Sequence, residues 1–394
     1  MTKGSAKKDG TIRLNPAKKR VVRGSADFPL IVLTTILSVF GVVMVFSASY
    51  YNAINDNGTP YSYLWKQAAF VLTGFIIMAV AANMNYAAWK VFAYPLAGIG
   101  VVLLLLIFTP MGVTVNGATR WLYIGYGSVG FTIMPGELAK LFLIIVCATY
   151  FAADMQKARQ FTGLLPIFVY TAIVGMLIIK QPNLSTAITA VIIAVGIAFL
   201  AGMHWRYVVL MAGAAVAGGY YLFFINDGYW HQRVVSFMDP FADALGGGYQ
   251  VVQGLLALGS GGLYGRGLGQ SVQKNLYLPE PQNDFILAII GEELGFLGIL
   301  ALMVVYALLV WRIFHICINA KDNFGMLIAA GVAMMVAAQV ILNVAVVTSS
   351  MPPTGIALPF VSYGGNSLWI FMLLIGIVLN ISKYRVVEEK EDDI

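Results

Sequence analysis

The chain has 394 residues, of which 59% are hydrophobic and only 11% are charged, and its formal net charge is +6. Soluble domains contain about 25% charged residues and about 45–50% apolar ones. The composition therefore excludes an ordinary soluble globule and a disordered chain, and it indicates an integral membrane protein.

Long apolar segments recur along the whole chain. A helix needs about 20 mostly apolar residues to cross a bilayer, whereas the strands of a membrane barrel alternate over segments of about ten residues. The apolar segments here are continuous, and we therefore predict an all-α integral membrane protein, a bundle of ten transmembrane helices that forms one membrane domain, 28–381. The ten predicted helices lie at 28–50, 64–83, 90–109, 135–153, 163–180, 185–202, 205–225, 284–311, 325–348 and 356–381.

The basic residues predict the orientation. Residues 1–27 form a tail with eight Lys or Arg. With that tail inside and ten crossings, 17 of the 24 basic residues fall on the inner side, while the 18 acidic residues divide nine and nine. The positive-inside rule then places both termini, including the tail 382–394, in the cytoplasm. Orientation and attraction to anionic lipid explain the net charge, and no nucleic-acid partner is predicted.

Several common chemistries have no motif in this chain. It contains no Walker motif, no His-Glu-x-x-His and no Gly-x-Ser-x-Gly, which disfavours an ATP-driven transporter, a zinc protease and a serine hydrolase. Cys147 and Cys317 lie in or near different apolar segments, so we predict no disulfide. The Cys and His residues also lack the spacing of a metal site.

Two outward segments, 110–134 and 226–283, are much longer than ordinary connectors. Loops of more than about 12–15 residues usually carry function or are disordered. The second loop is rich in aromatic residues and contains an apolar stretch at 251–258, which argues against disorder. We predict that it lies on the outer membrane surface with short interfacial helices, and that these two loops hold the chemistry.

Asp284 stands at the predicted start of the eighth membrane helix, after a segment with two prolines. One interpretation is a helix N-cap, because an Asp side chain accepts a hydrogen bond from a free backbone N–H there. The other is a general base at the boundary between membrane and water. A capping carboxylate can hardly take up a proton as well, so the two interpretations partly exclude each other.

Other ionisable residues fall inside predicted membrane helices, where they are costly and suggest function. Glu292 and Glu293 lie on different faces of the eighth helix, so they cannot both face one cavity. For Glu293 we favour a structural pair with a neighbouring helix. Glu137 and Lys140 share a face of the fourth helix, either as an internal ion pair or with Lys140 beside an anionic ligand.

The segment 358–365, Leu-Pro-Phe-Val-Ser-Tyr-Gly-Gly, resembles the signature of the SEDS family (shape, elongation, division and sporulation), which includes FtsW, RodA and SpoVE. Further blocks stand in the family's order along the chain, and the block around Asp284 is specific. Details of the large loop resemble the division and sporulation branch more than the elongation branch. The other matching blocks are 45–49, 66–67, 116–121, 135–140, 181–186 and 277–295.

The resemblance implies a peptidoglycan glycosyltransferase that polymerises lipid II and works with a class B penicillin-binding protein. The family's essential Asp corresponds to Asp284, and its paired Glu and Lys correspond to Glu137 and Lys140. The chain departs from the family motifs at four positions, Met134, Gly136, Asn183 and Ser185. Asn183 cannot carry the negative charge of the family's Asp, which leaves room for altered activity or a specialised paralogue.

The implied reaction is an inverting transfer at the outer leaflet with release of undecaprenyl pyrophosphate. We expect Asp284 to act as the base and cationic side chains to balance the pyrophosphate charge. Mg²⁺ or Mn²⁺ could share that role, although the sequence shows no dedicated metal cage. The predicted substrate-binding residues are Lys66, Arg120, Glu137, Lys140, Arg233, Lys274, Glu292 and Ser362.

The expected partners are lipid II, the nascent glycan strand, a class B penicillin-binding protein and other membrane proteins of division or sporulation, and the expected location is the bacterial inner membrane. Two other functions stay open. A lipid II flippase needs a polar path across the whole membrane, whereas most embedded charges here lie on the outer side. A non-catalytic scaffold would tolerate substitution of Asp284.

Overall fold

The structure is a computed structural model that describes residues 19–115, 118–126, 129–221, 224, 233–234 and 237–388. Asn116, the tail segments 1–18 and 389–394, and parts of the predicted loop 226–283 lie outside the described residues.

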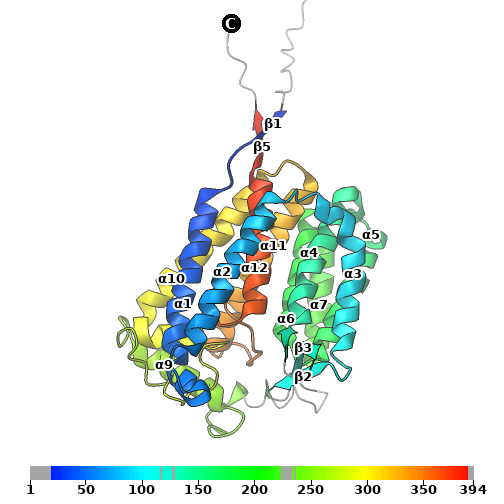
Figure 1. The fold of residues 1–394 in the computed structure, drawn as a ribbon. Helices are drawn as coiled ribbons and strands as arrows, with labels where there is room; N and C mark the ends of the chain where they lie inside the picture. Colours follow the sequence, from blue (N-terminus) through cyan, green and yellow to red (C-terminus); the bar gives the residue numbers. More distant parts are fainter. Residues whose placement is uncertain are drawn as a thin grey trace, which may run out of the picture.

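Helices occupy all ten predicted segments (Figure 1). Eight of them are long and apolar enough to cross a membrane, so the chain is a multi-pass membrane protein. The apolar helix α6 has 17 residues and α7 has 16, and ten crossings stay a prediction. The helices are α1 (Phe28–Asn57), α2 (Ser62–Asn83), α3 (Ala88–Leu106), α4 (Pro135–Ala153), α5 (Phe161–Ile179), α6 (Leu184–Leu200), α7 (Trp205–Tyr220), α10 (Ile286–Ile318), α11 (Asn323–Val347) and α12 (Gly365–Ser382).

Local sequence signals account for several helix ends. The side chain of Asp27 accepts a hydrogen bond from the N–H of Leu30 and so caps α1, and Gly58 ends that helix with a φ of 69°. Asn183 caps α6 through the N–H of Thr186. The last helix starts at Gly365, nine residues later than predicted, because the proline-containing segment before it is irregular.

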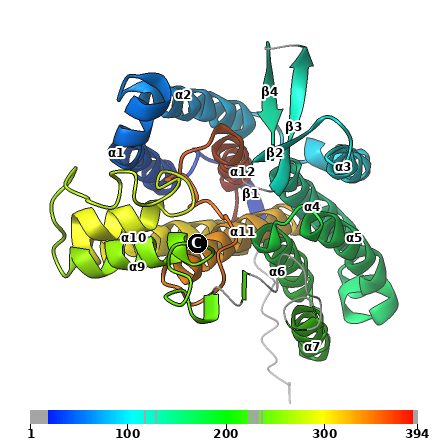
Figure 2. The same cartoon turned by 90° about the horizontal axis from the view of Figure 1, so that it is seen from below.

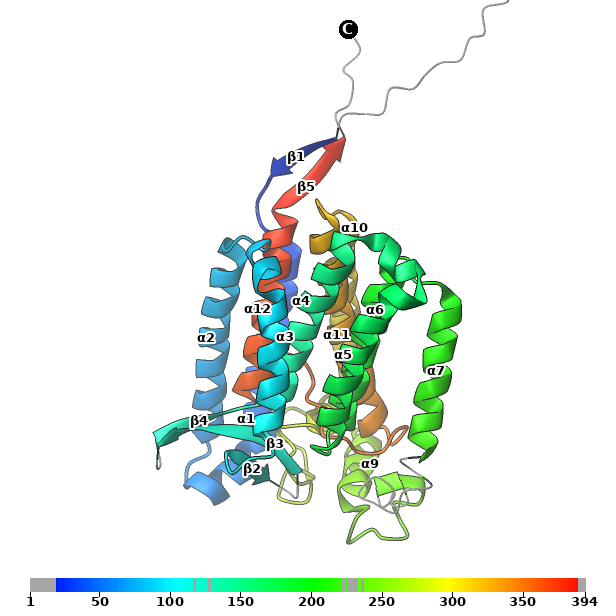
Figure 3. The same ribbon diagram turned by 90° about the vertical axis from the view of Figure 1, so that its right-hand side faces the viewer.

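A three-stranded antiparallel sheet forms in the loop 110–134, in the order β2 (Gly112–Val115), β3 (Ala118–Tyr126) and β4 (Val129–Ile133). Its strands are rich in β-branched and aromatic residues, which favour pleated structure. No strand was predicted in this loop, so the sheet corrects the prediction of an all-α chain. The sheet projects sideways from one end of the bundle (Figures 2 and 3).

The opposite end of the bundle carries both ends of the described chain. Strand β1 (Lys19–Arg23) pairs antiparallel with β5 (Tyr384–Glu388), beyond the last turn of α12. The two termini therefore leave from the same end, which we call the termini end. The end with the sheet is called the loop end. Placement of the termini in the cytoplasm stays a prediction.

The core of the bundle is formed by α4, α11 and α12, which are the most buried of the spans. Helix α11 packs against α10, α6 and α4 and lies in the middle of the bundle in Figure 2. Helix α7 stands at the periphery, and none of its residues is buried. The short 3-10 helix η1 (Met155–Arg159) connects α4 to α5.

The large loop before α10 contains a helix, α9 (Tyr249–Gly261), which includes the apolar stretch 251–258 and packs on α10. Its location at the membrane surface stays a prediction. Helix α10 itself is interrupted at Gly295, where φ is 70° and ψ is −170°. The backbone N–H of Arg266 and of Gly267 donate to the carbonyls of Glu292 and Glu293, each at 2.9 Å. The break is therefore satisfied by the loop chain, as membrane-embedded backbone requires.

Candidate active site

A cavity of about 1070 Å³ opens at the loop end of the bundle. It lies among the start of α2, the sheet strands β3 and β4, the segment 280–284, the irregular segment before α12 and the first turns of α12. Four of the predicted site residues line it together: Lys66, Arg120, Arg233 and Asp284. The fold thus joins residues that are up to 218 positions apart in sequence.

Asp284 is partly buried and lies two residues before α10. The N-cap position of α10 is Phe285 and has no side-chain hydrogen bond, so the capping interpretation of Asp284 is wrong. Its backbone is held instead, because Asn343 donates to the Asp284 carbonyl at 2.8 Å. The Asp284 carboxyl therefore faces the cavity and does not cap α10.

Burial raises the pKa of the Asp284 carboxyl to about 6, although the Arg120 and Arg233 guanidinium groups act in the opposite direction. The neighbouring Glu280 carboxyl raises it further. A carboxylate with a pKa near neutrality is a better proton acceptor than an ordinary Asp, whose pKa is about 3.9. The electrostatics of the cavity therefore suit Asp284 to accept a proton.

The two arginines of the cavity are fixed through their guanidinium groups. Arg120, on β3, donates to the carbonyl of Pro182, and Arg233 donates to the carbonyl of Pro353. A Cβ atom on Gly355 would lie 2.7 Å from Nη1 of Arg120, and Gly355 has a φ of 74°. Glycine is therefore required there, both by the backbone and by the close approach of the guanidinium.

Lys66 is exposed on the second turn of α2, with its ammonium group 5.8 Å from the centre of the Tyr63 ring. It adds a third positive charge to the lining, which also contains two carboxylates, Glu280 and Asp284. Three cations around one partly buried carboxylate form a site suited to an anionic ligand. Within the described residues, no group of three or more His, Cys, Asp or Glu is arranged to hold a metal ion.

The sequence reasoning missed several polar and aromatic residues of the cavity. Glu280 is the clearest case: burial and then the Asp56 charge raise its pKa, and it accepts hydrogen bonds from Gln282 and Asn283. Its position four residues before Asp284 was the available signal. The other missed lining residues include Gln250, Asn283, Asn366, Trp121, Tyr123 and Trp369.

The other predicted site residues lie outside the lining. Lys140 and Glu137 form a buried ion pair at 2.7 Å within the first turns of α4. Ser362 accepts a hydrogen bond from the N–H of Leu358 at 2.8 Å and so closes a turn before α12. The structure therefore places these three residues in the framework beside the cavity, and their role in substrate binding stays a prediction.

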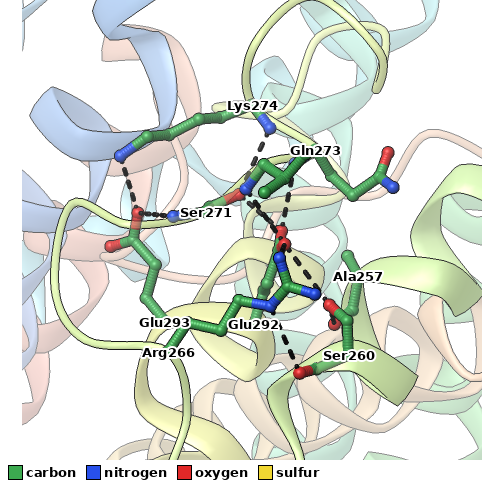
Figure 4. Close-up of polar contacts among 9 residues, drawn as sticks. Ala257, Ser260, Arg266, Ser271, Gln273, Lys274, Glu292 and Glu293 are labelled. Carbon is green, nitrogen blue, oxygen red and sulfur yellow. Dashed lines mark hydrogen bonds and ion pairs between the residues drawn. The ribbon is translucent and has the colours of Figure 1, made fainter.

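Lys274, Glu292 and Glu293 belong to a second polar network, between the large loop and α10 (Figure 4). Lys274 pairs with Glu293 at 2.8 Å, and Glu292 accepts hydrogen bonds from the loop residues Ser271, Val272 and Gln273. Glu293 was expected to pair with a neighbouring helix; it accepts a hydrogen bond from Ser47 of α1, but its charged partner, Lys274, lies on the large loop. For Lys274 and Glu292, a role in substrate binding stays a prediction.

Residues 28–386 match the model of the FtsW/RodA/SpoVE family, described as "Cell cycle protein". The chain belongs to this family. The chain is 39% identical over 358 residues to a probable peptidoglycan glycosyltransferase FtsW of Geobacter sp. strain M18, covering 90% of this chain and 96% of the relative.

Family members of more than one branch resemble the chain to a similar degree. The stage V sporulation protein E of Bacillus subtilis strain 168 is 36% identical over 362 residues, which cover 91% of this chain and 98% of that protein. The similarity thus extends over nearly the full length of an FtsW and of a sporulation relative. The family assignment confirms the resemblance inferred from the sequence.

Solved structures share the fold of this FtsW/RodA/SpoVE member. One is a chain from work on "structural coordination of polymerization and crosslinking by a peptidoglycan synthase complex", with a TM-score of 0.74 and 26% identity over 91% of this chain and 97% of that one. The rod shape determining protein RodA of Thermus thermophilus has a TM-score of 0.65 and 25% identity, over 91% of this chain and 96% of that one.

Proposed function

We propose that this chain is a peptidoglycan glycosyltransferase that polymerises lipid II at the outer leaflet of the bacterial inner membrane, in division or sporulation. One observation carries the proposal: the cavity at the loop end combines a partly buried carboxylate, Asp284, with three cationic side chains, Lys66, Arg120 and Arg233. Relatives named as glycosyltransferases match along nearly the whole chain, which supports the same reaction class.

In the proposed reaction, the hydroxyl of the acceptor sugar attacks the anomeric carbon of the donor. The Asp284 carboxylate takes up the hydroxyl proton as the new carbon–oxygen bond forms. The bond between the anomeric carbon and the pyrophosphate oxygen breaks, and its electron pair leaves with undecaprenyl pyrophosphate. One displacement of this kind inverts the anomeric configuration.

The three cations fit the leaving group. Pyrophosphate gains negative charge as it departs, and guanidinium and ammonium groups that line the cavity stabilise such charge. Because pyrophosphate already leaves readily, the proposal needs no strong general acid. A class B penicillin-binding protein is the proposed partner, in line with the structural likeness to a chain of a peptidoglycan synthase complex.

At position 183 this chain has Asn where the family motif has Asp, and this difference is compatible with the proposal. Asn183 is buried and caps α6 by accepting a hydrogen bond from the N–H of Thr186 at 3.3 Å. Asn and Asp are similarly good N-caps, so the local structure tolerates the neutral side chain.

The direct test is polymerisation of lipid II by the purified chain, co-expressed with a class B penicillin-binding protein. The substitution Asp284→Asn keeps the side-chain volume but removes the base, and we expect turnover to fall about 10²- to 10⁴-fold. Asp239→Asn is the matched control, since the Asp239 carboxyl is on the same loop and accepts a hydrogen bond from the N–H of Ala242. Its turnover should equal that of the unsubstituted protein.

Three results would contradict the proposal. Full turnover by the Asp284→Asn protein would end the base assignment. If the unsubstituted complex moves fluorescent lipid II across vesicle membranes without polymerising it, the flippase alternative is favoured. Growth of cells that carry only the Asp284→Asn protein would favour the scaffold alternative.

A further inference from the structure

A buried ion pair joins the large loop to two helices beside the cavity. The ammonium group of Lys274 lies 2.8 Å from Oε1 of Glu293 on α10 and 3.0 Å from Oγ of Ser47 on α1. The Ser47 hydroxyl donates to the same carboxylate, with Oγ 2.7 Å from Oε1 and 2.8 Å from Oε2. All three side chains are buried. Their mutual contacts satisfy the charges without a ligand.

The neighbouring carboxylate, Glu292, holds the turn that precedes Lys274. It accepts hydrogen bonds from the Ser271 hydroxyl and from the backbone N–H of Val272 and Gln273, at 2.5, 3.0 and 3.2 Å. The Ser260 hydroxyl of α9 donates to it as well, at 3.3 Å. Two successive carboxylates of α10 therefore bind one short stretch of loop chain, as Figure 4 shows.

These contacts fix one end of the segment that carries Asp284. From the buried Lys274 the chain passes through 275–283 and returns to α10 two residues after Asp284. Within that segment Leu276 and Glu280 have positive φ values of 66° and 48°. Residues other than glycine adopt such backbone only where the surroundings hold them there. The ends of the segment supply that restraint, at Lys274 and at the Asp284 carbonyl bound by Asn343.

We infer that Lys274, Glu293 and Ser47 form a clamp that positions Asp284 for proton transfer, and that Lys274 acts through the loop and does not touch the substrate. This inference rests on the proposed function. It differs from the sequence-based expectation that Lys274 binds the pyrophosphate. Catalysis depends steeply on the placement of reacting groups, so a looser loop should slow the chemical step more than it weakens substrate binding.

The chain offers a matched control for the clamp. Arg312 of α10 and Asp27 at the start of α1 form a two-fold hydrogen-bonded ion pair at 2.9 and 2.7 Å, at the termini end. It joins the same two helices, but it holds no part of the large loop. A substitution there tests whether any lost α1–α10 ion pair has the same consequence.

The experiment compares Lys274→Met, Lys274→Met with Glu293→Gln, Lys274→Arg and Arg312→Met in the complex with the penicillin-binding protein. The double variant removes both buried charges, so it keeps the test open if the single variant does not fold. Two readouts are used: hydrogen exchange of the backbone in 271–285, and kcat and KM for lipid II polymerisation. Peptides from α11 serve as the internal reference for exchange.

We expect faster exchange in 271–285 for the Lys274→Met and double variants, with kcat at least tenfold lower and KM changed less than threefold. Lys274→Arg should recover most of kcat, and Arg312→Met should leave both readouts unchanged. The inference is overturned if the double variant matches the unsubstituted protein in exchange and kcat. It is also overturned if KM rises tenfold while exchange is unchanged, because Lys274 would then bind the substrate.

Failure of the proposed function gives a separate result. In that case the unsubstituted complex does not polymerise lipid II. The exchange measurement then still decides whether the clamp holds the loop, although the clamp would have no role in lipid II polymerisation.

Discussion

The charged residues at the loop end of the bundle occupy two different environments. In the buried pairs, Lys140 with Glu137 and Lys274 with Glu293, each ammonium group lies within 2.8 Å of a carboxylate. In the cavity, Arg120 and Arg233 donate to backbone carbonyls, and the carboxylate beside them, Asp284, is partly exposed. The buried pairs and the cavity lining together contain several of the few charged residues of this chain, in which only 11% of residues are charged.

The difference separates stability from chemistry. A buried carboxylate that is paired with a buried cation is not available to bind a ligand. Removal of either partner leaves the other as an unpaired buried charge. Charges that line an open cavity can bind an anionic substrate and change its reactivity. Substitution of the first group should therefore act on folding and, for Lys274 with Glu293, on turnover only through the position of Asp284. Substitution of the second group should act on turnover directly.

The largest effect should come from breaking a buried pair on one side. Lys140→Met leaves the Glu137 carboxylate buried without its cation, which should cost about 3–5 kcal/mol of stability. The double variant with Glu137→Gln should recover most of that loss. The measurement is the midpoint of thermal unfolding in detergent micelles. Equal midpoints for the single variant and the unsubstituted protein would remove the distinction between the two groups.

A smaller effect, on turnover alone, should follow from a change in the cavity. Hydrogen bonds to charged groups contribute about 1.5–3 kcal/mol, so Arg233→Gln should lower kcat/KM for lipid II about 10- to 150-fold. The unfolding midpoint should stay the same. Arg206→Gln, an exposed arginine at the start of α7, is the control and should change neither quantity. A lower midpoint with normal turnover for Arg233→Gln would contradict the assignment.

The smallest effect should be a shift of the pH profile. The base works as a carboxylate, so kcat/KM should fall as the pH drops through about 6, the pKa of Asp284. Arg120 lowers that pKa and Glu280 raises it. The acid midpoint of Arg120→Gln should therefore move to higher pH, and that of Glu280→Gln to lower pH. Midpoints that move in the opposite directions would show that another group titrates.

The sequence predicted the helices well because a membrane span is recognised from the composition of about 20 neighbouring residues. All ten apolar segments became helices, and α4 begins at the predicted residue. The strands of 112–133 were missed because short β-branched stretches in a loop give a weak signal beside long apolar segments. The break at Gly295 was also missed, since it depends on hydrogen bonds from a distant loop.

The candidate site was likewise predicted only in part. Family motifs and the scarcity of charge were enough to single out Asp284, Glu137 and Lys140. They did not reveal which cations share a cavity with Asp284, because Lys66, Arg120 and Arg233 come from three separate parts of the chain. Lys274 and Lys66 look alike in the sequence, yet one is buried against a carboxylate and the other lines the cavity.

By itself, the sequence therefore determined the membrane class, the positions of the helices and the family resemblance, and it singled out Asp284 as the proposed base. Those properties depend on composition and on short motifs, which act over a few neighbouring residues. The tertiary structure decided which charged residues form buried pairs and which line the cavity. That choice depends on contacts between segments far apart in the chain, whose packing no local pattern records.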